Sequence, residues 1–165
     1  MLKPRTMKES SLVATYLMLP ADANPWGNVH GGVIMRRIDE AGGTVAMRHS
    51  RKRIVTASID RMNFLKPVYV GNLLILKAVM NYTGKTSMEV GVKVEAEDLR
   101  TGKLTHTGTA YLTYVALDNK GKPTRVPPIT PETEEEKRRY AEAKVRRQKR
   151  LEELGKHRVL STKKD

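Results

Sequence analysis

Four consecutive segments of this chain carry β-strand patterns and are joined by short links. In the clearest, residues 88–97, apolar side chains at even positions alternate with Glu, Lys and Gly at odd positions. This period of two predicts a strand with one face buried and the other in water. The other three span 54–64, 73–82 and 104–117, and a further strand is expected over 11–19. Because the links at 70–72, 83–85 and 100–103 each contain glycine, we expect antiparallel hairpins.

One helical segment lies between the first strand and the other four. Across residues 32–48, Ile34, Ile38, Ala41 and Val45 recur at spacings that place them on one helix face. The paired glycines that interrupt the segment would cost stability in a helix unless another element approaches the backbone closely there. The order β-α-β-β-β-β therefore predicts an α+β fold in which one antiparallel sheet curls around one long helix.

The last quarter of the chain has a different composition. Four prolines within residues 122–131 predict an extended connection. Thr130, Pro131 and Glu132 then read as the N-cap, the first residue and the acidic first turn of a helix that ends near Gly155, with a frayed remainder. Its apolar residues are too sparse for a long coiled coil. We therefore expect one domain over 8–121, followed by a connection and helical tail over 122–165.

The chain is strongly basic, with a net charge of +13 from 31 Lys and Arg against 18 Asp and Glu. Because the body and the tail both carry an excess of basic residues, the charge favours a polyanionic ligand: nucleic acid, an acidic membrane surface or a phosphorylated cofactor such as coenzyme A. A single Phe and a single Trp disfavour a stacking platform for single strands, and glutamates interrupt the basic tail. We therefore expect no specific nucleic-acid partner.

Cysteine is absent, which excludes disulfides and a thiolate nucleophile. The polar N-terminus has no apolar stretch typical of a signal peptide, and no apolar run approaches the length of a membrane span. The four histidines are scattered without the spacing of metal ligands. We expect a cytoplasmic protein with no metal site and no membrane partner.

The loop over residues 22–32 is rich in polar residues and glycine and leads directly into the helix. Gly31 and Gly32 would let a ligand approach the backbone, and the start of a helix presents unpaired N–H groups that can stabilise an oxyanion. Asp39 follows about two turns later. An aspartate on a mostly apolar helix is costly unless it is paired or functional, whereas Asp39 and Glu40 could also simply mark the wet side of the helix. From the residues alone both interpretations stay open.

The order of several short motifs resembles one known family. An asparagine, three glycines and an aspartate occur in the spacing of the hot-dog acyl-CoA thioesterases, at Asn24, Gly27, Gly31, Gly32 and Asp39. The chain is especially similar to the cytosolic, brain-type acyl-CoA hydrolases and their bacterial relatives. The similarity continues through residues 63–68, 84–87, 126–128 and 131–137. It implies a hot-dog fold and hydrolysis of fatty acyl-CoA.

The resemblance also implies roles for individual residues. Asn24 and Asp39 would be catalytic and would come from opposite subunits. Asp39 would act as a general base for water or as a nucleophile that forms a mixed anhydride; Asn24 would position the water or polarise the carbonyl. Backbone N–H groups near His30, Gly31 and Gly32 would form the oxyanion hole, although His30 could equally be a structural loop residue. Glu40 is the rival carboxylate, but Asp39 matches the motif.

Basic side chains and one hairpin turn are candidate contacts for the phosphates of coenzyme A, and the resemblance implies an assembly. The expected contacts are Arg61, Asn63, Lys66, Gly84, Lys85, Thr86 and Ser87. No cofactor is expected beyond coenzyme A as part of the substrate. Because the site would be shared between subunits, we expect a homodimer, assembled as a trimer of dimers.

Two other functions compete with this interpretation. A hot-dog dehydratase would need a histidine that works with a carboxylate across the dimer, and no histidine in the main helix start has the expected proline context. The other is a non-catalytic module that senses acyl-CoA or binds nucleic acid through the basic body of the chain. Release of thiol from acyl-CoA distinguishes a hydrolase from a binding module.

Overall fold

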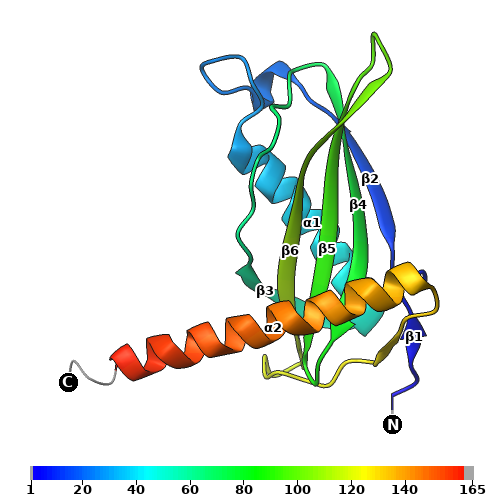
Figure 1. The fold of residues 1–165 in the computed structure, drawn as a ribbon, viewed down its shortest axis with the longest axis vertical. Helices are drawn as coiled ribbons and strands as arrows, with labels where there is room; N and C mark the ends of the chain where they lie inside the picture. The colour runs from blue at the N-terminus through cyan, green and yellow to red at the C-terminus, as the bar shows by residue number, and fades with distance from the viewer. Residues whose placement is uncertain (1, 162–165) are drawn as a thin grey trace.

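The computed structural model describes residues 2–161 and forms the expected α+β fold (Figure 1). Five strands make one antiparallel sheet in the order β2-β4-β5-β6-β3. Their bounds are Leu12–Leu17 for β2, Arg53–Ile59 for β3, Asn72–Thr83 for β4, Ser87–Asp98 for β5 and Lys103–Leu117 for β6. A short 3-10 turn, Pro20–Asp22, precedes the long helix α1, Gly31–Ser50.

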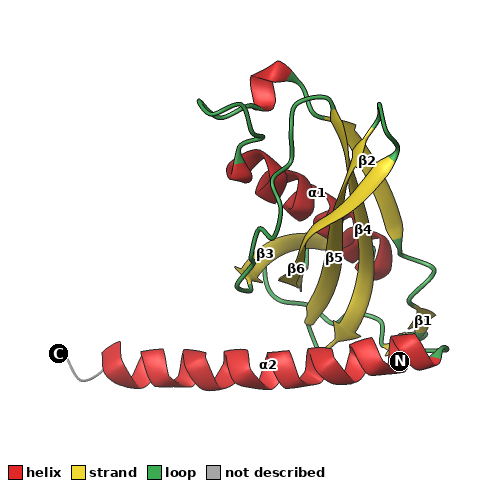
Figure 2. Cartoon of the chain, turned by 45° about the horizontal axis from the view of Figure 1, so that its top comes forward, coloured by secondary structure: helices red, strands yellow, loops and turns green. Residues whose placement is uncertain are grey.

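Helix α1 lies against the concave face of the curled sheet, so the prediction of a sheet around one long helix is confirmed (Figures 1 and 2). Ile34, Ile38, Ala41 and Val45 are all buried, as their spacing predicts. They pack against the inward-facing apolar side chains of β4, β5 and β6 in one core. Burying one stripe of a helix against one face of a sheet is how both elements remove apolar surface from water.

Strand β3 is shorter than predicted and leaves one edge of the sheet unpaired. It ends at Ile59 rather than at Phe64, and residues 60–71 return as a loop along the sheet (Figure 1). The loop is tied by a hydrogen bond from Leu65 N to Thr107 O, 2.9 Å. Strand β3 is the last strand of the sheet, and β6 is its one neighbour among the described strands. Within the described protomer, the backbone of β3 is therefore open on one side.

The C-terminal helix starts later and ends later than the sequence predicts. Helix α2 spans Glu134–Ser161. Its cap is Thr133, whose Oγ1 accepts from Glu136 N at 3.2 Å, while the Glu136 carboxylate accepts from Thr133 N at 3.1 Å. The predicted cap at Thr130 is therefore wrong: Thr130 lies in a short strand, and the reciprocal capping box places the helix start after Thr133. That strand, β7, Ile129–Thr130, pairs in parallel with β1, Arg5–Thr6, and neither strand was predicted.

The predicted helix end at Gly155 is wrong, because the helix continues to Ser161; only the last part of the expected frayed tail, residues 162–165, lies outside the described residues. Glycine weakens a helix but does not by itself end it. No helix within residues 2–161 combines the length and the apolar composition needed to cross a membrane.

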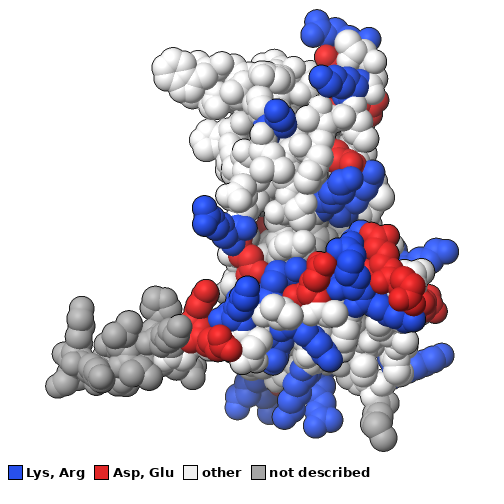
Figure 3. All heavy atoms as spheres, in the orientation of Figure 1, with Lys and Arg blue, Asp and Glu red and all other residues white. Residues whose placement is uncertain are grey.

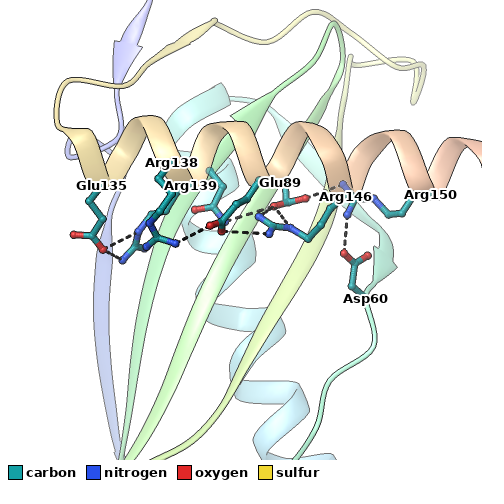
Figure 4. Close-up of polar contacts among 9 residues, drawn as sticks. Asp60, Glu89, Glu135, Arg138, Arg139, Arg146 and Arg150 are labelled. Carbon is teal, nitrogen blue, oxygen red and sulfur yellow. Dashed lines mark hydrogen bonds and ion pairs between the residues drawn. The ribbon is translucent and has the colours of Figure 1, made fainter.

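Helix α2 crosses the face of the sheet opposite to α1, so the outer face of β5 is not wet at this end (Figures 1 and 4). Glu89 was expected on a solvated face, yet its side chain is 1% exposed. Arg146 Nη2 and Arg150 Nη2 contact its two oxygens at 2.7 and 2.8 Å. A period of two in the sequence shows which residues share a face of a strand. It cannot show that a helix distant in sequence covers the polar face of that strand.

Candidate active site

Asp39 lies on the side of α1 that faces strands β3 and β6, near the open edge of the sheet. Its side chain is half-buried, and its Oδ1 accepts hydrogen bonds from Thr56 Oγ1 at 2.9 Å and from Tyr114 Oη at 3.2 Å. Its Oδ2 accepts no hydrogen bond from the described residues. Two hydroxyl donors therefore hold one carboxylate oxygen in a fixed direction and leave the other available for chemistry.

Tyr114 supports Asp39 from inside the core. The tyrosine is fully buried, and its hydroxyl lies 3.1 Å from the carbonyl oxygen of Asp39 as well as 3.2 Å from Oδ1. Burial, followed by the nearby Asp39 charge, raises the pKa of the Tyr114 hydroxyl far above its ordinary value. The phenol therefore keeps its proton and acts as a donor toward Asp39.

Glu40, the rival carboxylate, is engaged with two arginines of its own helix. Its oxygens contact Arg36 Nε at 2.9 Å and Arg37 Nη1 at 3.1 Å. Partial burial alone would raise the pKa of Glu40, but the hydrogen bonds from the two guanidinium groups outweigh that effect and lower it. The neighbouring carboxylates thus have different surroundings: Glu40 is neutralised by cations, and Asp39 is held by neutral hydroxyls.

Asn24 organises the loop before α1 rather than contacting Asp39. Its side-chain Oδ1 accepts from Trp26 N at 2.9 Å and from Asn28 N at 3.2 Å, which closes the turn that carries the exposed Trp26. Among the described residues its Nδ2 donates no hydrogen bond. Within one protomer, the structure does not bring the two predicted catalytic side chains together.

Of the three backbone N–H groups predicted for the oxyanion hole, at His30, Gly31 and Gly32, two donate to other groups within residues 2–161. His30 N donates to Asp22 O at 2.8 Å, and Gly32 N donates to His30 Nδ1 at 3.0 Å. His30 is therefore the N-cap of α1, and its proton resides on Nε2. Gly31 N has no hydrogen bond among the described residues, so of the three it is the donor still available for an oxyanion.

The predicted coenzyme A contacts fall into two groups at opposite ends of the sheet. The turn of residues 84–87 joins β4 to β5 at the end that α2 crosses, and Arg61 and Ser87 line one groove there. Lys66 lines a separate groove beside the β5–β6 hairpin. Asn63 lies between them, where its carbonyl oxygen abuts Gly108. One protomer therefore does not assemble all seven residues around one ligand.

Basic side chains on the α2 face gather along α2 and beneath it, a smaller basic group lies at the upper right, and the upper left of the same face is mostly uncharged (Figure 3). Several of these cations are neutralised by acids on the same helix, such as Arg139 by Glu135. Within residues 2–161, no three His, Cys, Asp or Glu side chains are placed to hold a metal ion.

Sequence reasoning missed both hydroxyl donors of Asp39. Thr56 and Tyr114 look like ordinary strand residues, because threonine and tyrosine are favoured in strands. One signal was present: the paired glycines of the helix required a close neighbour, and the Tyr114 ring is that neighbour at Gly42. The sequence could not show which residue it would be.

Comparison with known proteins identifies the family of the chain. The pattern of the Thioesterase superfamily matches residues 27–103. An uncharacterized acyl-CoA thioester hydrolase, YkhA of Bacillus subtilis, is 44% identical over 132 residues, which cover 80% of this chain and 77% of the relative.

Solved structures show the same fold. An apo-hexameric acyl-CoA thioesterase superposes with a TM-score of 0.89 at 40% identity, covering 93% of this chain and 98% of the other. An acyl-CoA hydrolase from Staphylococcus aureus, in complex with butyryl coenzyme A and coenzyme A, has a TM-score of 0.83 at 36% identity, covering 95% and 98%. The chain therefore belongs to the thioesterase superfamily with the hot-dog fold, among the enzymes that hydrolyse acyl-CoA thioesters.

Proposed function

We propose that the chain hydrolyses fatty acyl-CoA to a free fatty acid and coenzyme A, with Asp39 as the reacting carboxylate and Asn24 supplied by a partner subunit. The observation that carries this proposal is the fixed orientation of Asp39, whose Oδ1 is held by two hydroxyls while Oδ2 is left open. A cytoplasmic location is also part of the proposal and rests on the sequence alone.

Asp39 can act by either of two routes. As a general base, Oδ2 takes a proton from water while the water oxygen attacks the thioester carbonyl carbon. As a nucleophile, Oδ2 attacks that carbon itself and forms a mixed anhydride that water then hydrolyses. In both routes the C–S bond breaks and coenzyme A leaves as a thiolate that takes up a proton.

The developing negative charge on the carbonyl oxygen needs donors, and two are available. Within residues 2–161, Gly31 N at the positive end of α1 donates no hydrogen bond, and Asn24 presents Nδ2 because its Oδ1 is occupied by the loop. This arrangement favours the role of Asn24 in polarising the carbonyl over that of positioning the water, for which Oδ1 would have to accept a hydrogen bond. His30 then serves the site by capping α1 and shaping its first turn.

The Staphylococcus aureus hydrolase offers support from spacing. Variants of that enzyme have been characterised in which an asparagine, an aspartate and a threonine are each replaced by alanine. The asparagine lies 15 positions before the aspartate, and the threonine lies 17 positions after it. Asn24, Asp39 and Thr56 have the same separations. This agreement supports the assignment of Asn24 and Asp39 and adds Thr56 to the site.

The exposed edge of β3 supports a shared site. In the described part of the chain the strand is hydrogen-bonded on one side only, and its Val55 and Ile59 are 45% and 41% exposed. An open edge with apolar side chains is a template for pairing with another chain. Since Asp39 lies beside this edge through its bond with Thr56, a second copy seated there could bring its own Asn24 loop to the carboxylate. We propose a homodimer, assembled as a trimer of dimers.

The decisive experiment is thiol release from acyl-CoA by Asp39→Asn. The chain has no cysteine, so every thiol detected comes from coenzyme A. Asparagine keeps an Oδ1 acceptor for Thr56 and Tyr114 but can neither take a proton nor attack; turnover should disappear while thermal stability stays unchanged. Glu40→Gln is the matched control and should retain activity. Near-normal turnover by Asp39→Asn would refute the role of Asp39.

Subunit complementation tests the shared site. Asn24→Ala and Asp39→Asn should each be nearly inactive alone. After mixed refolding, a hybrid dimer contains one intact pair, so about a quarter of wild-type activity should return at random pairing of two-fold dimers. If each site is built within one protomer, no mixture regains activity.

A further inference from the structure

Helix α2 is longer than the width of the sheet that it crosses. Its 28 residues measure about 42 Å, whereas five strands at a spacing of about 4.8 Å span roughly 20 Å. Among the described side chains, the last polar contacts from α2 to the sheet are those of Arg150 with Glu89 and with Asp60, which follows the edge strand β3. Residues 151–161, about 16 Å of helix, form an overhang beyond that edge (Figure 1).

The side of α2 that faces the sheet becomes apolar where the overhang begins. Ala143, Arg150 and Leu154 follow one another at spacings of seven and four, which places them on one side of the helix. Ala143 is fully buried and Arg150 is paired with the sheet, yet Leu154 is 60% exposed. Leu151, in the preceding turn, is 46% exposed. Leucines on this side of the helix are favourable only where another surface covers them.

The outer face of the edge strand presents apolar surface at the same place. Because the neighbouring Thr56 faces α1, the exposed Val55 lies on the side of the sheet that carries α2. Ile59 lines a groove of about 650 Å³ together with Leu151 and Leu154. Exposed apolar side chains from strand and helix thus gather at one edge, and a contiguous patch of this kind is typical of a protein–protein contact.

The overhang is held in a fixed direction by ion pairs at its base (Figure 4). Arg146 and Arg150 contact the buried carboxylate of Glu89 at 2.7 and 2.8 Å, and Arg150 also contacts Asp60 at 2.7 Å. The guanidinium of Arg146 lies 3.7 Å from the ring centroid of Tyr111. Because the base of the helix is fixed, binding of another surface to the overhang orders few further groups and loses little entropy.

We propose that a second copy of the chain covers this surface, with the overhang of each α2 docked beside β3 on the outer face of the other subunit. The proposal rests on the shared dimer of the proposed function, in which the open edge of β3 faces that copy. A helix that runs past this edge then runs over the second subunit. Under two-fold symmetry the same patch is used by both copies, so each pair of leucines meets apolar surface of the other subunit.

The extent of the interface also favours this docking. Strand β3 has seven residues, and its pairing alone covers only part of the roughly 800 Å² per partner that a stable interface of standard size buries. Further surface beside β3 must therefore be buried. The overhang and the outer face of β3 are continuous with the edge and apolar, which is the character of the buried centre of an interface.

Charged side chains around the leucines suit a reciprocal contact. Arg61, Arg147 and Lys149 line the groove and form no ion pair among the described side chains, and the same holds for Glu153. In a two-fold contact, Glu153 of each copy can pair with one of these cations of the other copy. Since the cations outnumber the acid, charge fixes the register of the contact, and the apolar surface supplies the attraction.

Single introduced thiols test whether the leucines are covered, because the chain has no cysteine. Leu154 and Val145 are 60% and 56% exposed in the protomer, and they lie on opposite sides of α2. A bulky maleimide should react with Leu154→Cys at least about tenfold more slowly than with Val145→Cys, and equally fast with both after unfolding in urea. Equal rates in the native protein would overturn the proposal.

Subunit exchange tests what covers them. Two preparations that differ in mass are mixed, and hybrid dimers are followed by native mass spectrometry. Leu151→Ser/Leu154→Ser should exchange subunits at least about tenfold faster than the wild type, because lost interface contacts mainly speed dissociation. Val145→Ser is the matched control and should exchange at the wild-type rate. A protected thiol at position 154 with unchanged exchange of the double variant would mean that the same chain covers the leucines, and the proposal would be wrong.

Failure of this docking can be told apart from failure of the proposed function. If no thioester is hydrolysed while position 154 is protected and the double variant exchanges faster, the docking stands and the proposed function falls. If Asn24→Ala and Asp39→Asn subunits complement one another while position 154 reacts freely, the shared dimer stands and the docking of α2 falls.

Discussion

The Tyr114 hydroxyl fills the space that a side chain at Gly42 would need. A Cβ added at Gly42 would lie 2.5 Å from the Tyr114 hydroxyl oxygen and 3.2 Å from its Cζ. The same hydroxyl donates to Asp39. A glycine in the middle of α1, which weakens the helix, is therefore the condition that lets a buried phenol reach the carboxylate.

We expect Tyr114→Phe to lower kcat about tenfold with little change in KM, because it removes a hydrogen bond that orients Asp39 while the ring remains. Gly42→Ala should have a similar effect, since the added methyl group displaces the hydroxyl. In the double variant the two effects on kcat should not add. Tyr114→Phe has already removed the hydroxyl that the methyl group of Gly42→Ala would displace, and the nearest atom left to that methyl group is a ring carbon. Steady-state kinetics on the four proteins measures this; full additivity would show that Gly42 does not act through Tyr114.

Thr56 is expected to act on Asp39 through its hydroxyl alone. Thr56→Val keeps the branched shape of the side chain but removes the donor, and kcat should fall by about tenfold, the equivalent of one hydrogen bond to a charged group. Thr56→Ser keeps the oxygen and should retain most of the activity. Activity retained by Thr56→Val would show that the hydrogen bond to Asp39 is not what Thr56 contributes.

Glu89 should stabilise the attachment of α2 to the sheet. Glu89→Gln leaves Arg146 and Arg150 without their shared carboxylate in a largely buried site, so the free energy of unfolding should fall by about 3 kcal/mol in denaturant titration. Glu135→Gln removes a solvent-exposed partner of Arg139 and serves as the control, with an unchanged midpoint expected. An equally small effect of both changes would show that α2 is held mainly by apolar contacts.

His49 should make the fold less stable in mild acid. The side chain is fully buried and its Nε2 lies 2.9 Å from Pro127 O; burial holds the pKa of His49 below its ordinary value of 6.5. Arg5 lowers it further, against opposing effects of the Pro127 carbonyl and Glu9. The unfolded chain therefore binds a proton as the pH falls through 6.5, before the folded chain does, and stability is lost over that range.

The loss of stability should have a slope of up to about 1.4 kcal/mol per pH unit, the limit for one proton. Denaturant unfolding at pH 7.5, 6.5 and 5.5 measures it. His49→Gln keeps an N–H donor for Pro127 O but does not titrate, so its stability should change less over this range. A slope identical to that of the wild type would place the acid sensitivity elsewhere.

Local patterns predicted most of the elements. Alternation identified β5, and the spacing of Ile34, Ile38, Ala41 and Val45 identified the buried face of α1, because these periods follow directly from the geometry of strand and helix. Boundaries that depend on competing hydrogen bonds were predicted less well. The cap of α2 lies at Thr133 rather than Thr130, since the reciprocal bonds with Glu136 favour it.

What the sequence by itself determined is the fold class, the family and the motif that contains Asn24 and Asp39, because these depend on the order and spacing of residues along the chain. Only the tertiary structure decided which residues hold Asp39. Thr56 and Tyr114 come from strands 17 and 75 positions away in sequence, and no local pattern marks them. It also decided that α2 covers Glu89, since the pairing of an acid with two distant arginines depends on how helix and sheet pack in space.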